Sequence, residues 1–309
     1  MKTSVLMTLY NGEAYLIEQL DSIRNQTRVP DEVIICDDGS KDNSVSMVQE
    51  YIHKYGLEDS WRLYINEKNL GYANNFCNGM KYTQGDIVFF CDQDDVWYEC
   101  KLEEMSRIME DNAKIKLLCT EFDPFICSED APSIPAQFMR YMTGSGLVEQ
   151  LALNEKTIFI GSEGCVMSIR KDFFEDILEY HFDGWAHDEF VWKMAVVSGS
   201  CYYYHKPMIK RRMHSANVSK QKMHDIKKRI GFLERLLVSH NKMLEYGCSI
   251  GINNADKSLI KKNIEAAELR IGLLKDKRYV NFVKLAFCYR KNYQSRKSIP
   301  VELFMAMKG

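Results

Sequence analysis

The stretch VFFCDQDD at residues 88–95 changes abruptly from apolar to acidic. Its first four residues are typical of a buried β-strand, and three carboxylates follow within the next four positions. Carboxylates this close together repel one another, so a strand that ends in such a cluster needs a nearby positive charge. The segments on either side of this stretch indicate where that positive charge comes from.

Composition limits the classes of protein to which the chain can belong. The 309 residues are 46% hydrophobic and 27% charged, as in globular proteins with one large domain or two smaller ones. The N-terminus, MKTSVLMTLYNG, has too short an apolar stretch for a signal peptide, and no run reaches the roughly 18 apolar residues of a membrane span. The ten cysteines form no CxxC pair, so we expect no zinc site and reduced cysteines in a cytoplasmic protein.

The net charge of −2 is unevenly distributed along the chain. Residues 206–309 contain 24 Lys and Arg against 8 Asp and Glu, whereas residues 1–205 contain 17 basic and 35 acidic side chains. A basic surface suits anionic lipid or nucleic acid, and a solvated helical surface explains it equally well. The two parts are therefore expected to face different partners.

Strand-like and helix-like segments alternate through the first 122 residues. Near-continuous apolar runs predict strands, and the segments between them have apolar residues at helical spacing. The predicted strands are residues 4–10, 32–38, 61–67, 85–92 and 115–122, and the predicted helices are 12–26, 44–56, 72–81 and 96–110. This alternation is typical of an α/β fold, with a mostly parallel sheet covered by helices on both faces.

Polar side chains follow three of the predicted strands. Residues 8–11 end the first strand, Asp37 and Asp38 end the second, and residues 92–95 end the fourth. Ligands of open α/β sheets bind beyond the carboxyl ends of the strands, so we expect the three groups to meet at one edge. Each group taken alone would also fit a solvated turn or a helix N-cap.

The ordered combination of these segments resembles a known enzyme family. Four segments are similar to the nucleotide-sugar half of a family 2 glycosyltransferase with the GT-A fold: SVLMTLYNG (4–12), EVIICDDGSKDNS (32–44), NLGYANNF (69–76) and VFFCDQDDVW (88–97). Two more are similar to acceptor-side segments of that family: WAHDEF (185–190) and RRMHSANVS (211–219). The resemblance is closest to bacterial rhamnosyltransferase-like enzymes of polysaccharide synthesis.

The resemblance implies a domain organisation. It covers about residues 1–220, which are expected to form a GT-A domain with a nucleotide-sugar half at 1–122 and an acceptor half at 123–220. A basic, helical extension would follow at 221–309. A Rossmann dehydrogenase is disfavoured because YNGEAY, rather than a GxGxxG loop, follows the first strand, and no Walker A motif is present. The remaining alternatives are a sugar-nucleotide-forming nucleotidyltransferase and a catalytically silent sugar-binding or scaffold domain.

The same resemblance assigns the donor-binding residues. It places Thr8 and Tyr10 around the base and ribose, and Asp38 on the N–H edge of the base. Asp37 and Asn75 are further candidates, although a turn would explain Asp37 and a helix cap would explain Asn75. The expected donor is a dTDP- or UDP-linked sugar, with rhamnose suggested by the nearest resemblance.

The acidic cluster suits a divalent cation. A departing nucleoside diphosphate gains negative charge, and Mn²⁺ or Mg²⁺ neutralises it while binding carboxylate oxygens, phosphate and water. The resemblance makes Asp94 the first metal ligand and places Asp92 near the ribose and the metal. His214 would complete the metal shell or bind the diphosphate, and Arg212 would offset phosphate charge.

Transfer with inversion requires a general base on the acceptor side. The acceptor hydroxyl loses its proton as it attacks the anomeric carbon, opposite the departing diphosphate. In the family resembled here the base is the Asp of an ED or HD pair at the start of a helix, which makes Asp188 the first candidate. Glu189 is the competing candidate. Asp188 also fits a helix N-cap, as does Asp95 before a helix that begins at Val96.

The basic C-terminal region predicts helices and a membrane surface. Residues 224–247 and 259–274 are amphipathic, and residues 278–297 combine aromatic residues with Lys and Arg and contain no acidic residue. The last pattern is typical of an interfacial helix drawn to anionic lipid, while packing on the protein or a dimer contact fits equally well. The resemblance implies a glycan or lipid-linked oligosaccharide acceptor, and we expect no nucleic-acid partner. The expected location is cytoplasmic, with a peripheral contact at the inner face of the cell membrane.

Overall fold

The computed structural model describes residues 1–128, 131, 133–214 and 225–308. The chain divides into two compact units. The first unit comprises Met1–Leu151, Ile160–Ala195 and Ser200–Asn217, and the second comprises Ala152–Phe159, Val196–Gly199 and Val218–Gly309. Two short inserts, 152–159 and 196–199, group with the C-terminal residues, which we did not predict from the sequence. The finer division of residues 1–220 into a donor half and an acceptor half stays a prediction.

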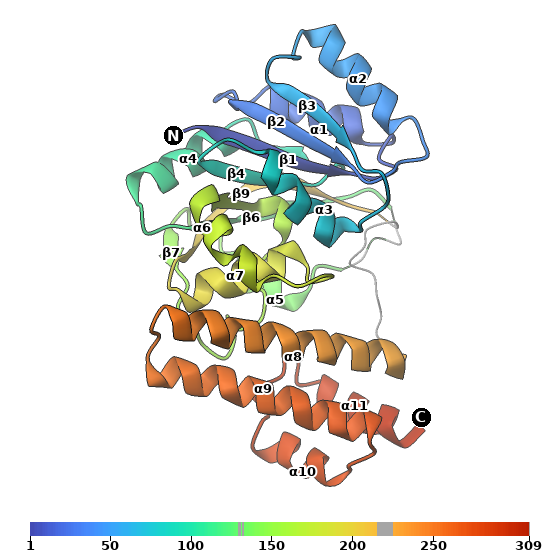
Figure 1. Cartoon of the computed structure of the whole chain (residues 1–309), viewed down its shortest axis with the longest axis vertical. Coiled ribbons are helices and arrows are strands. Elements are labelled where there is room, and N and C mark those ends of the chain that lie inside the picture. Colours follow the sequence, from blue (N-terminus) through green and yellow to red (C-terminus); the bar gives the residue numbers. More distant parts are fainter. Residues whose placement is uncertain (129–130, 132, 215–224, 309) are drawn as a thin grey trace. The chain divides into compact units, whose positions relative to one another are not determined.

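A mixed sheet forms the centre of the first unit. Its strands are β1 (Thr3–Leu9), β2 (Glu32–Asp37), β3 (Trp61–Ile65), β4 (Ile87–Cys91), β5 (Val96–Trp97), β6 (Leu117–Ile126), β7 (Val148–Gln150), β8 (Met167–Arg170) and β9 (Cys201–Met213). The helices of this unit are α1 (Leu16–Arg24), α2 (Ser44–Tyr55), α3 (Tyr72–Gly79), α4 (Lys101–Asp111), α5 (Ala136–Met139), α6 (Lys171–Ile177) and α7, which begins at His187 and ends at Val197. Figure 1 shows this arrangement, and it confirms the predicted α/β class.

The sheet is parallel in its first half and mixed in its second. Its strand order is β3-β2-β1-β4-β8-β6-β9-β5, with β7 paired to β9. The four strands from β3 to β4 are parallel to one another, as predicted. Beyond them, β8 lies antiparallel between β4 and β6, so the fifth predicted strand does not pair with the fourth. The sequence did not reveal β8 because four residues, MSIR, are too few to show a period.

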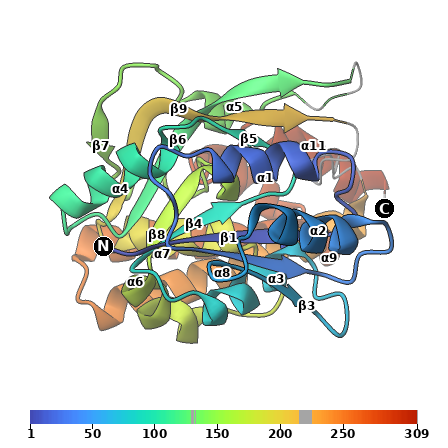
Figure 2. The ribbon, with the colours of Figure 1, turned by 90° about the horizontal axis from the view of Figure 1, so that it is seen from above.

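Side chains of β1 alternate between two helix-covered faces. Val5, Met7 and Leu9 belong to a buried cluster that includes apolar residues of α1, α2 and α4. Leu6 points to the other face, where a Cβ on Gly79 of α3 would lie 2.7 Å from its Cδ1. Figure 2 shows α1 and α3 on opposite sides of β1. Because both faces are covered, the strands read as continuous apolar runs, and the predicted covering by helices on both faces is confirmed.

The helix predicted over residues 96–110 is shorter than expected. Val96 and Trp97 form the short strand β5 and pair antiparallel with β9, and α4 begins only at Lys101. The predicted N-cap role of Asp95 was therefore wrong. Its carboxylate Oδ1 instead accepts the backbone N–H of Arg212 at 2.9 Å. The pairing partner of this segment comes from more than a hundred residues further along the chain, where local sequence gives no indication of it.

The second unit is helical. Its helices are α8 (Ile226–Ser249), α9 (Asn254–Lys275), α10 (Val280–Phe287) and α11 (Ser298–Lys308). α8 and α9 confirm the two predicted amphipathic helices, and side-chain oxygens of Asp225 and Asn253 cap their first turns. In the described part of the chain, none of the helices has the length and apolar character that a membrane span requires.

The continuous helix predicted over 278–297 forms only between Val280 and Phe287. The residues after it turn inward: Asn292 and Tyr293 are buried, and the Tyr293 ring centroid lies 4.3 Å from the Arg270 guanidinium. Packing of this aromatic side chain against α9 overrides the local helical pattern.

A buried ion cluster joins three helices of the second unit. Glu302 of α11 is completely buried, and its Oε1 accepts from Arg229 Nε of α8 at 2.8 Å and from Arg270 Nη2 of α9 at 2.7 Å. Arg270 Nε also donates to Oε2 of the same carboxylate at 3.0 Å. Removing one member of a buried ion cluster leaves the others charged and without compensation.

We predict that Glu302→Ala destabilises the second unit by about 3–5 kcal/mol, because it leaves the buried guanidinium of Arg270 and the half-buried one of Arg229 without their carboxylate. Hydrogen exchange of α8, α9 and α11 peptides should speed up, while peptides of the first unit should not change. The matched control is Glu245→Ala, which removes only a half-exposed pair with Lys242 and should leave exchange as it is. Unchanged protection in Glu302→Ala would show that the cluster does not hold α11.

Candidate active site

Three neighbouring parallel strands end at the same edge of the sheet. β1 pairs in parallel with both β2 and β4, and the residues that directly follow the three strands are Tyr10, Asp38 and Asp92. The structure thus brings together the three polar groups that the sequence predicted to meet. This edge is the candidate active site.

Asp38 anchors a loop to the end of β2. Its buried carboxylate accepts the backbone N–H of Leu70 at 2.7 Å and of Gly71 at 2.8 Å, and the side-chain amide of Asn66 at 2.9 Å. The same Asn66 nitrogen donates to Asn75 Oδ1 at 2.9 Å. A carboxylate offers about four lone-pair sites, so these three bonds leave Asp38 capacity for one further donor.

Asn75 and Gly71 fix the path of this loop. Asn75 is buried, and its Nδ2 donates to the backbone oxygen of Cys36 at 2.8 Å. Gly71 has a φ of 78°, in the left-handed region that side chains disfavour. Both residues were predicted from the segment NLGYANNF. Their contacts attach the loop to β2, and a direct donor contact of Asn75 stays a prediction.

Asp37 organises the turn after β2. Its fully buried carboxylate accepts the backbone N–H groups of Gly39 and Ser40 at 3.0 Å each, and the Ser40 hydroxyl also donates to it. These bonds are the turn role that the sequence left open for Asp37. The predicted donor contact of this residue stays a prediction.

Gln93 holds the backbone at the end of β1. Its Oε1 accepts the N–H of Tyr10 at 2.7 Å, and its Nε2 donates to the Tyr10 carbonyl at 3.0 Å. The Tyr10 side chain is exposed, and Thr8 is half-buried two residues earlier. Sequence reasoning missed Gln93, and its position between two candidate aspartates was the one indication available.

Two predicted metal ligands are in direct contact. His214 Nε2 lies 2.8 Å from Asp94 Oδ2, although the two residues are 120 positions apart. Arg212, just before His214, donates from Nε to the backbone oxygen of Asp94 at 2.7 Å. Its guanidinium also lies 4.5 Å from the Tyr15 ring centroid and 4.6 Å from that of Phe125. Arg212 therefore holds the end of β9 against the acidic segment.

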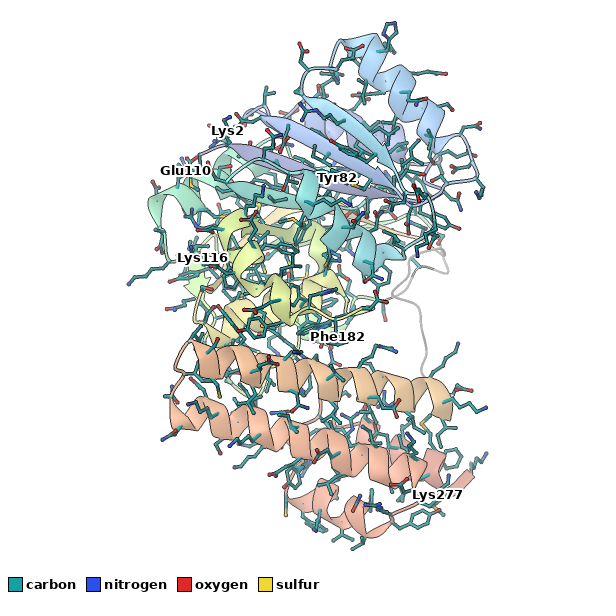
Figure 3. The ribbon with its side chains drawn as sticks, viewed as in Figure 1. Lys2, Tyr82, Glu110, Lys116, Phe182 and Lys277 are labelled. Carbon is teal, nitrogen blue, oxygen red and sulfur yellow. The ribbon has the colours of Figure 1, made fainter. Side chains whose placement is uncertain are left out.

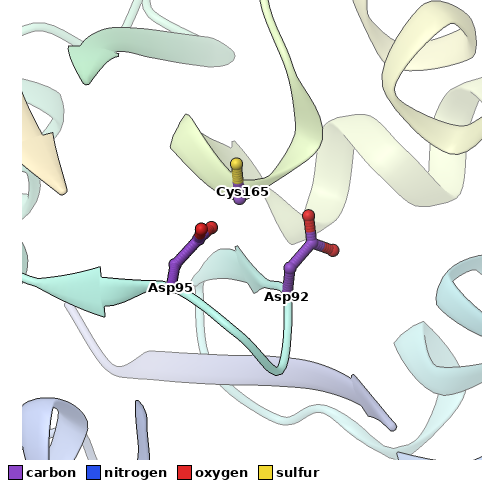
Figure 4. Close-up of side chains that lie close together, drawn as sticks. All are labelled: Asp92, Asp95 and Cys165. Carbon is purple, nitrogen blue, oxygen red and sulfur yellow. The ribbon is translucent and has the colours of Figure 1, made fainter. Parts of the chain in front are cut away.

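Asp92 and Asp95 form a second acidic group together with Cys165. Figure 4 shows Asp92, Asp95 and Cys165, whose ligand atoms all lie within 4.8 Å of one another. Burial raises the pKa of Asp92 to about 7, and the nearby charge of Asp94 adds to the shift. Burial also raises the pKa of Asp95, again with a contribution from Asp94. Among the described residues, Asp92 thus groups with Asp95 and Cys165, while Asp94 and His214 form a separate pair.

Two buried cations lie close to these carboxylates. Lys101 Nζ donates to the backbone oxygen of Cys165 at 2.8 Å and lies 3.8 Å above the Trp97 ring. Arg211 forms an ion pair with Glu163. The positive charges of Arg211 and Lys101 both act to lower the pKa of Asp92 and so limit the effect of burial. Sequence reasoning missed Lys101, because a lysine in the first turn of an amphipathic helix normally reads as a solvated residue.

The two candidate bases at the start of α7 differ in their surroundings. Glu189 Oε1 lies 2.7 Å from the Nζ of Lys193, a lysine with no exposed surface. Asp188 Oδ1 accepts the backbone N–H of Glu189 at 2.7 Å, and burial raises the pKa of Asp188 to about 6 despite this bond. The charge of Asp188 is also one of the causes that raise the pKa of Asp92.

His187 fixes the start of α7. Its ring stacks on Phe76 of α3, with centroids 3.8 Å apart, and meets Phe90 of β4 edge-on at 5.2 Å. A Cβ on Gly164 would lie 2.3 Å from His187 Nε2, so a glycine is required there. Burial lowers the pKa of His187 to about 3, and the ring is therefore neutral. Its packing sets the position of the neighbouring Asp188.

Comparison with known proteins identifies the fold and the family. The family model described as "Glycosyl transferase family 2" matches residues 4–177. The structure of S. aureus TarS 1-349 in complex with UDP-GlcNAc superposes with a TM-score of 0.68 and 17% identity, over 99% of this chain and 87% of that one. The mannosyltransferase PcManGT from Pyrobaculum calidifontis, in complex with GDP-Man and Mn²⁺, gives a TM-score of 0.58 and 15% identity, over 99% and 86% of the two chains. These likenesses confirm the predicted GT-A fold.

A curated relative matches about a third of the chain. The Escherichia coli enzyme WfgD, named UDP-Glc:alpha-D-GlcNAc-diphosphoundecaprenol beta-1,3-glucosyltransferase, is 32% identical over 110 residues, which are 35% of this chain and 42% of that protein. The chain spans 15% to 45% of the length of several other curated relatives. These matches favour the glycosyltransferase interpretation over the nucleotidyltransferase and the silent scaffold.

We predict that Asn66→Ala destabilises the first unit by about 1–3 kcal/mol, because it leaves a buried oxygen of Asn75 without its donor and removes one bond from Asp38. Urea unfolding followed by tryptophan fluorescence measures the loss, and hydrogen exchange should speed up in residues 66–76. The matched control is Asn78→Ala, whose side chain bonds only Lys81 at the surface. Equal stability of the two variants would contradict an anchoring role for the Asp38 network.

Proposed function

We propose a specific reaction for this chain, which belongs to glycosyl transferase family 2. It transfers a sugar from a nucleoside diphosphate to a hydroxyl of a glycan or lipid-linked acceptor, with inversion and with a divalent cation. The contact between Asp94 and His214 carries the proposal. Two distant segments bring a carboxylate and an imidazole together at the edge of the sheet, where ligands of α/β folds bind.

The donor nucleotide occupies the edge formed by β1 and β2. The free lone-pair capacity of Asp38 suits the N3–H group of a pyrimidine, which favours a UDP- or dTDP-linked sugar. Tyr10 supplies an exposed ring or hydroxyl for the base or ribose, and Thr8 lies beside it. Asp37 and Asn75 support this edge through the turn and the loop that they hold. The bound UDP-GlcNAc of TarS supports a uridine donor.

The donor set at the end of β4 fits a divalent cation. Asp94 offers a carboxylate oxygen and His214 a ring nitrogen 2.8 Å away. Asp92 is the third ligand that we propose, and its carboxylate would have to turn from Asp95 and Cys165 towards this pair. A nitrogen ligand favours Mn²⁺ over the harder Mg²⁺, and PcManGT was solved with Mn²⁺. When bound, the ion would neutralise charge on the departing diphosphate. Arg212 keeps Asp94 and His214 together through its bond to the backbone oxygen of Asp94. A contact of Arg212 with the donor phosphates would be a second role.

Asp188 acts as the general base. The acceptor oxygen attacks the anomeric carbon, the bond from that carbon to the phosphate oxygen breaks with its electron pair, and the hydroxyl proton passes to the Asp188 carboxylate. A pKa of about 6 leaves Asp188 deprotonated near neutral pH yet basic enough to take a proton. Glu189 is the weaker candidate, because its carboxylate is bound to the buried ammonium of Lys193.

The sugar and the acceptor belong to cell-surface polysaccharide synthesis. WfgD is named for a glucosyl transfer to a sugar on diphosphoundecaprenol, which supports a lipid-linked acceptor for this chain. Rhamnose from a dTDP donor is the other donor that we propose. A screen of both sugar nucleotides, read as release of nucleoside diphosphate, distinguishes the two.

We predict that Asp94→Ala and Asp188→Asn each lower turnover by about 10²–10⁴-fold, for different reasons. Asp94→Ala should also abolish the Mn²⁺-dependent part of donor binding, measured by calorimetry, whereas Asp188→Asn should keep it. The matched control is Glu189→Gln, which should retain most of the turnover. If Asp188→Asn turns over like the wild type while Glu189→Gln does not, the base is Glu189.

We predict an acid limb in the pH profile of kcat/KM. Asp188 accepts a proton only when it is deprotonated, and burial raises its pKa to about 6. The rate should therefore be constant above that pH and fall about tenfold per unit below it. Glu189→Gln should keep this limb but move it to lower pH, because the charge of Glu189 also raises the pKa of Asp188. Disappearance of the limb in that variant would argue against Asp188.

A further inference from the structure

The short helix α10 presents a row of apolar side chains to solvent. Val280, Val283 and Phe287 are three and four positions apart, hence on one face, and are 68%, 55% and 82% exposed. The opposite face is anchored: Leu285 is buried, and Asn281 Nδ2 donates to a backbone oxygen of α9 at 3.0 Å. An 82% exposed phenylalanine on an anchored helix is a strong indication of a binding surface.

The last helix, α11, carries a second row. Val301, Phe304 and Met307 recur every three residues and are all exposed, Met307 by 69%. The helix is fixed from its other side by Glu302, whose buried carboxylate binds Arg229 and Arg270. This row is therefore not the loose end of a fraying helix.

The two rows adjoin at one corner of the second unit. Lys277 Nζ and Tyr279 Oη, just before α10, donate to the backbone oxygen of Ala306 at 2.9 and 3.1 Å. These bonds place the beginning of α10 beside the last turn of α11, where Met307 lies; Figure 3 labels Lys277 there. We call the six exposed side chains the C-terminal face: Val280, Val283, Phe287, Val301, Phe304 and Met307.

The segment that carries the C-terminal face is rich in Lys and Arg. Two of them pair with acidic residues outside this segment, Arg278 with Asp276 and Lys291 with Glu155. Residues 277–308 contain eight Lys and Arg and a single acidic residue, Glu302, which is buried and already paired. Lys284 is exposed between Val283 and Phe287 on α10, and Lys308 Nζ lies 4.6 Å from the Phe304 ring centroid. The long aliphatic stems of such lysines can lie along an apolar surface while their ammonium groups reach water or phosphate.

We propose that the C-terminal face binds the surface of a bilayer that contains anionic lipid. Its valine, phenylalanine and methionine side chains enter the boundary between headgroups and acyl chains, and the surrounding Lys and Arg contact lipid phosphate. The role of this binding rests on the proposed function, because a lipid-linked acceptor lies at such a surface. The binding itself needs no donor or metal.

The charge pattern favours a bilayer over other binding partners of the C-terminal face. A second copy of the chain docked through the same face would bring two sets of Lys and Arg together, which is unfavourable. A nucleic acid would offer phosphates but nothing to cover two rows of aliphatic and aromatic side chains. An anionic bilayer offers an apolar interior for the exposed apolar side chains and negative charge for the Lys and Arg. The structure also revises the sequence prediction, because α10 and α11, rather than one helix over 278–297, supply the face.

The test is co-sedimentation of the full chain with vesicles. Wild type should sediment with vesicles of phosphatidylcholine and phosphatidylglycerol and much less with phosphatidylcholine alone. The double variant Phe287→Ser with Phe304→Ser should lower the partition coefficient about tenfold on anionic vesicles. Lys284→Glu with Lys308→Glu should lower it about tenfold as well, and salt should weaken the binding that remains. All four side chains are exposed, so far-UV circular dichroism should be unchanged.

Two control variants each replace one exposed side chain outside the C-terminal face. Val29→Ser removes an exposed apolar side chain of the first unit, and Lys261→Glu reverses an exposed charge on α9; both should bind like the wild type. Failure of wild type to sediment with anionic vesicles, or full binding by the phenylalanine variant, would overturn the proposal. So would a concentration-dependent dimer, seen by sedimentation velocity without lipid, that the phenylalanine variant abolishes.

A separate measurement keeps this inference apart from the proposed function. Metal-dependent release of nucleoside diphosphate from the sugar nucleotide, assayed without vesicles, reports only the first unit. Release without vesicle binding refutes the C-terminal face alone. Vesicle binding without release supports the face and refutes the proposed reaction.

Discussion

Repulsion among the carboxylates that follow β4 constrains the arrangement of the first unit. Asp92, Asp94 and Asp95 lie within four positions at the end of a buried strand, where the surroundings weaken screening. Each has a different compensation. Asp94 meets His214, Asp95 accepts a backbone N–H at the end of β9, and Asp92 lies in the field of two buried cations. The fold brings β9 and α4 to this edge, and with them the groups that make a carboxylate cluster tolerable.

This compensation is incomplete in a way that suits a ligand. Burial still raises the pKa of Asp92 to about 7, so the cations present do not fully balance the negative charge. Such an excess of negative charge is compatible with the divalent cation that we propose for this site. The side chain that faces Asp94 is the imidazole of His214, which offers a ring nitrogen as a ligand where a lysine or arginine would offer none.

The sequence predicted the parts of the structure that depend on local pattern. Apolar runs located β1 to β4, helical spacing located α8 and α9, and the strand ends located Asp38, Asp92 and Asp94 at one edge. The parts it did not predict depend on partners far along the chain. The two residues of β5 pair with β9, the four residues of β8 insert between β4 and β6, and Tyr293 packs on Arg270 and so ends α10 early. Lys101 and Gln93 were missed for the same reason, since only their tertiary neighbours distinguish them from surface residues.

The pair of acids at the start of α7 shows what the structure adds to a motif. In the sequence, Asp188 and Glu189 are adjacent carboxylates, and the resemblance favoured Asp188 through the HD pair alone. In the structure, α7 turns them in different directions: Glu189 is bound to the buried ammonium of Lys193, whereas burial without such a partner raises the pKa of Asp188 to about 6. His187, packed between Phe76 and Phe90 and against Gly164, fixes the turn that creates this difference. The Glu189 carboxylate thereby neutralises a buried lysine, and the Asp188 carboxylate retains the basicity that proton transfer requires.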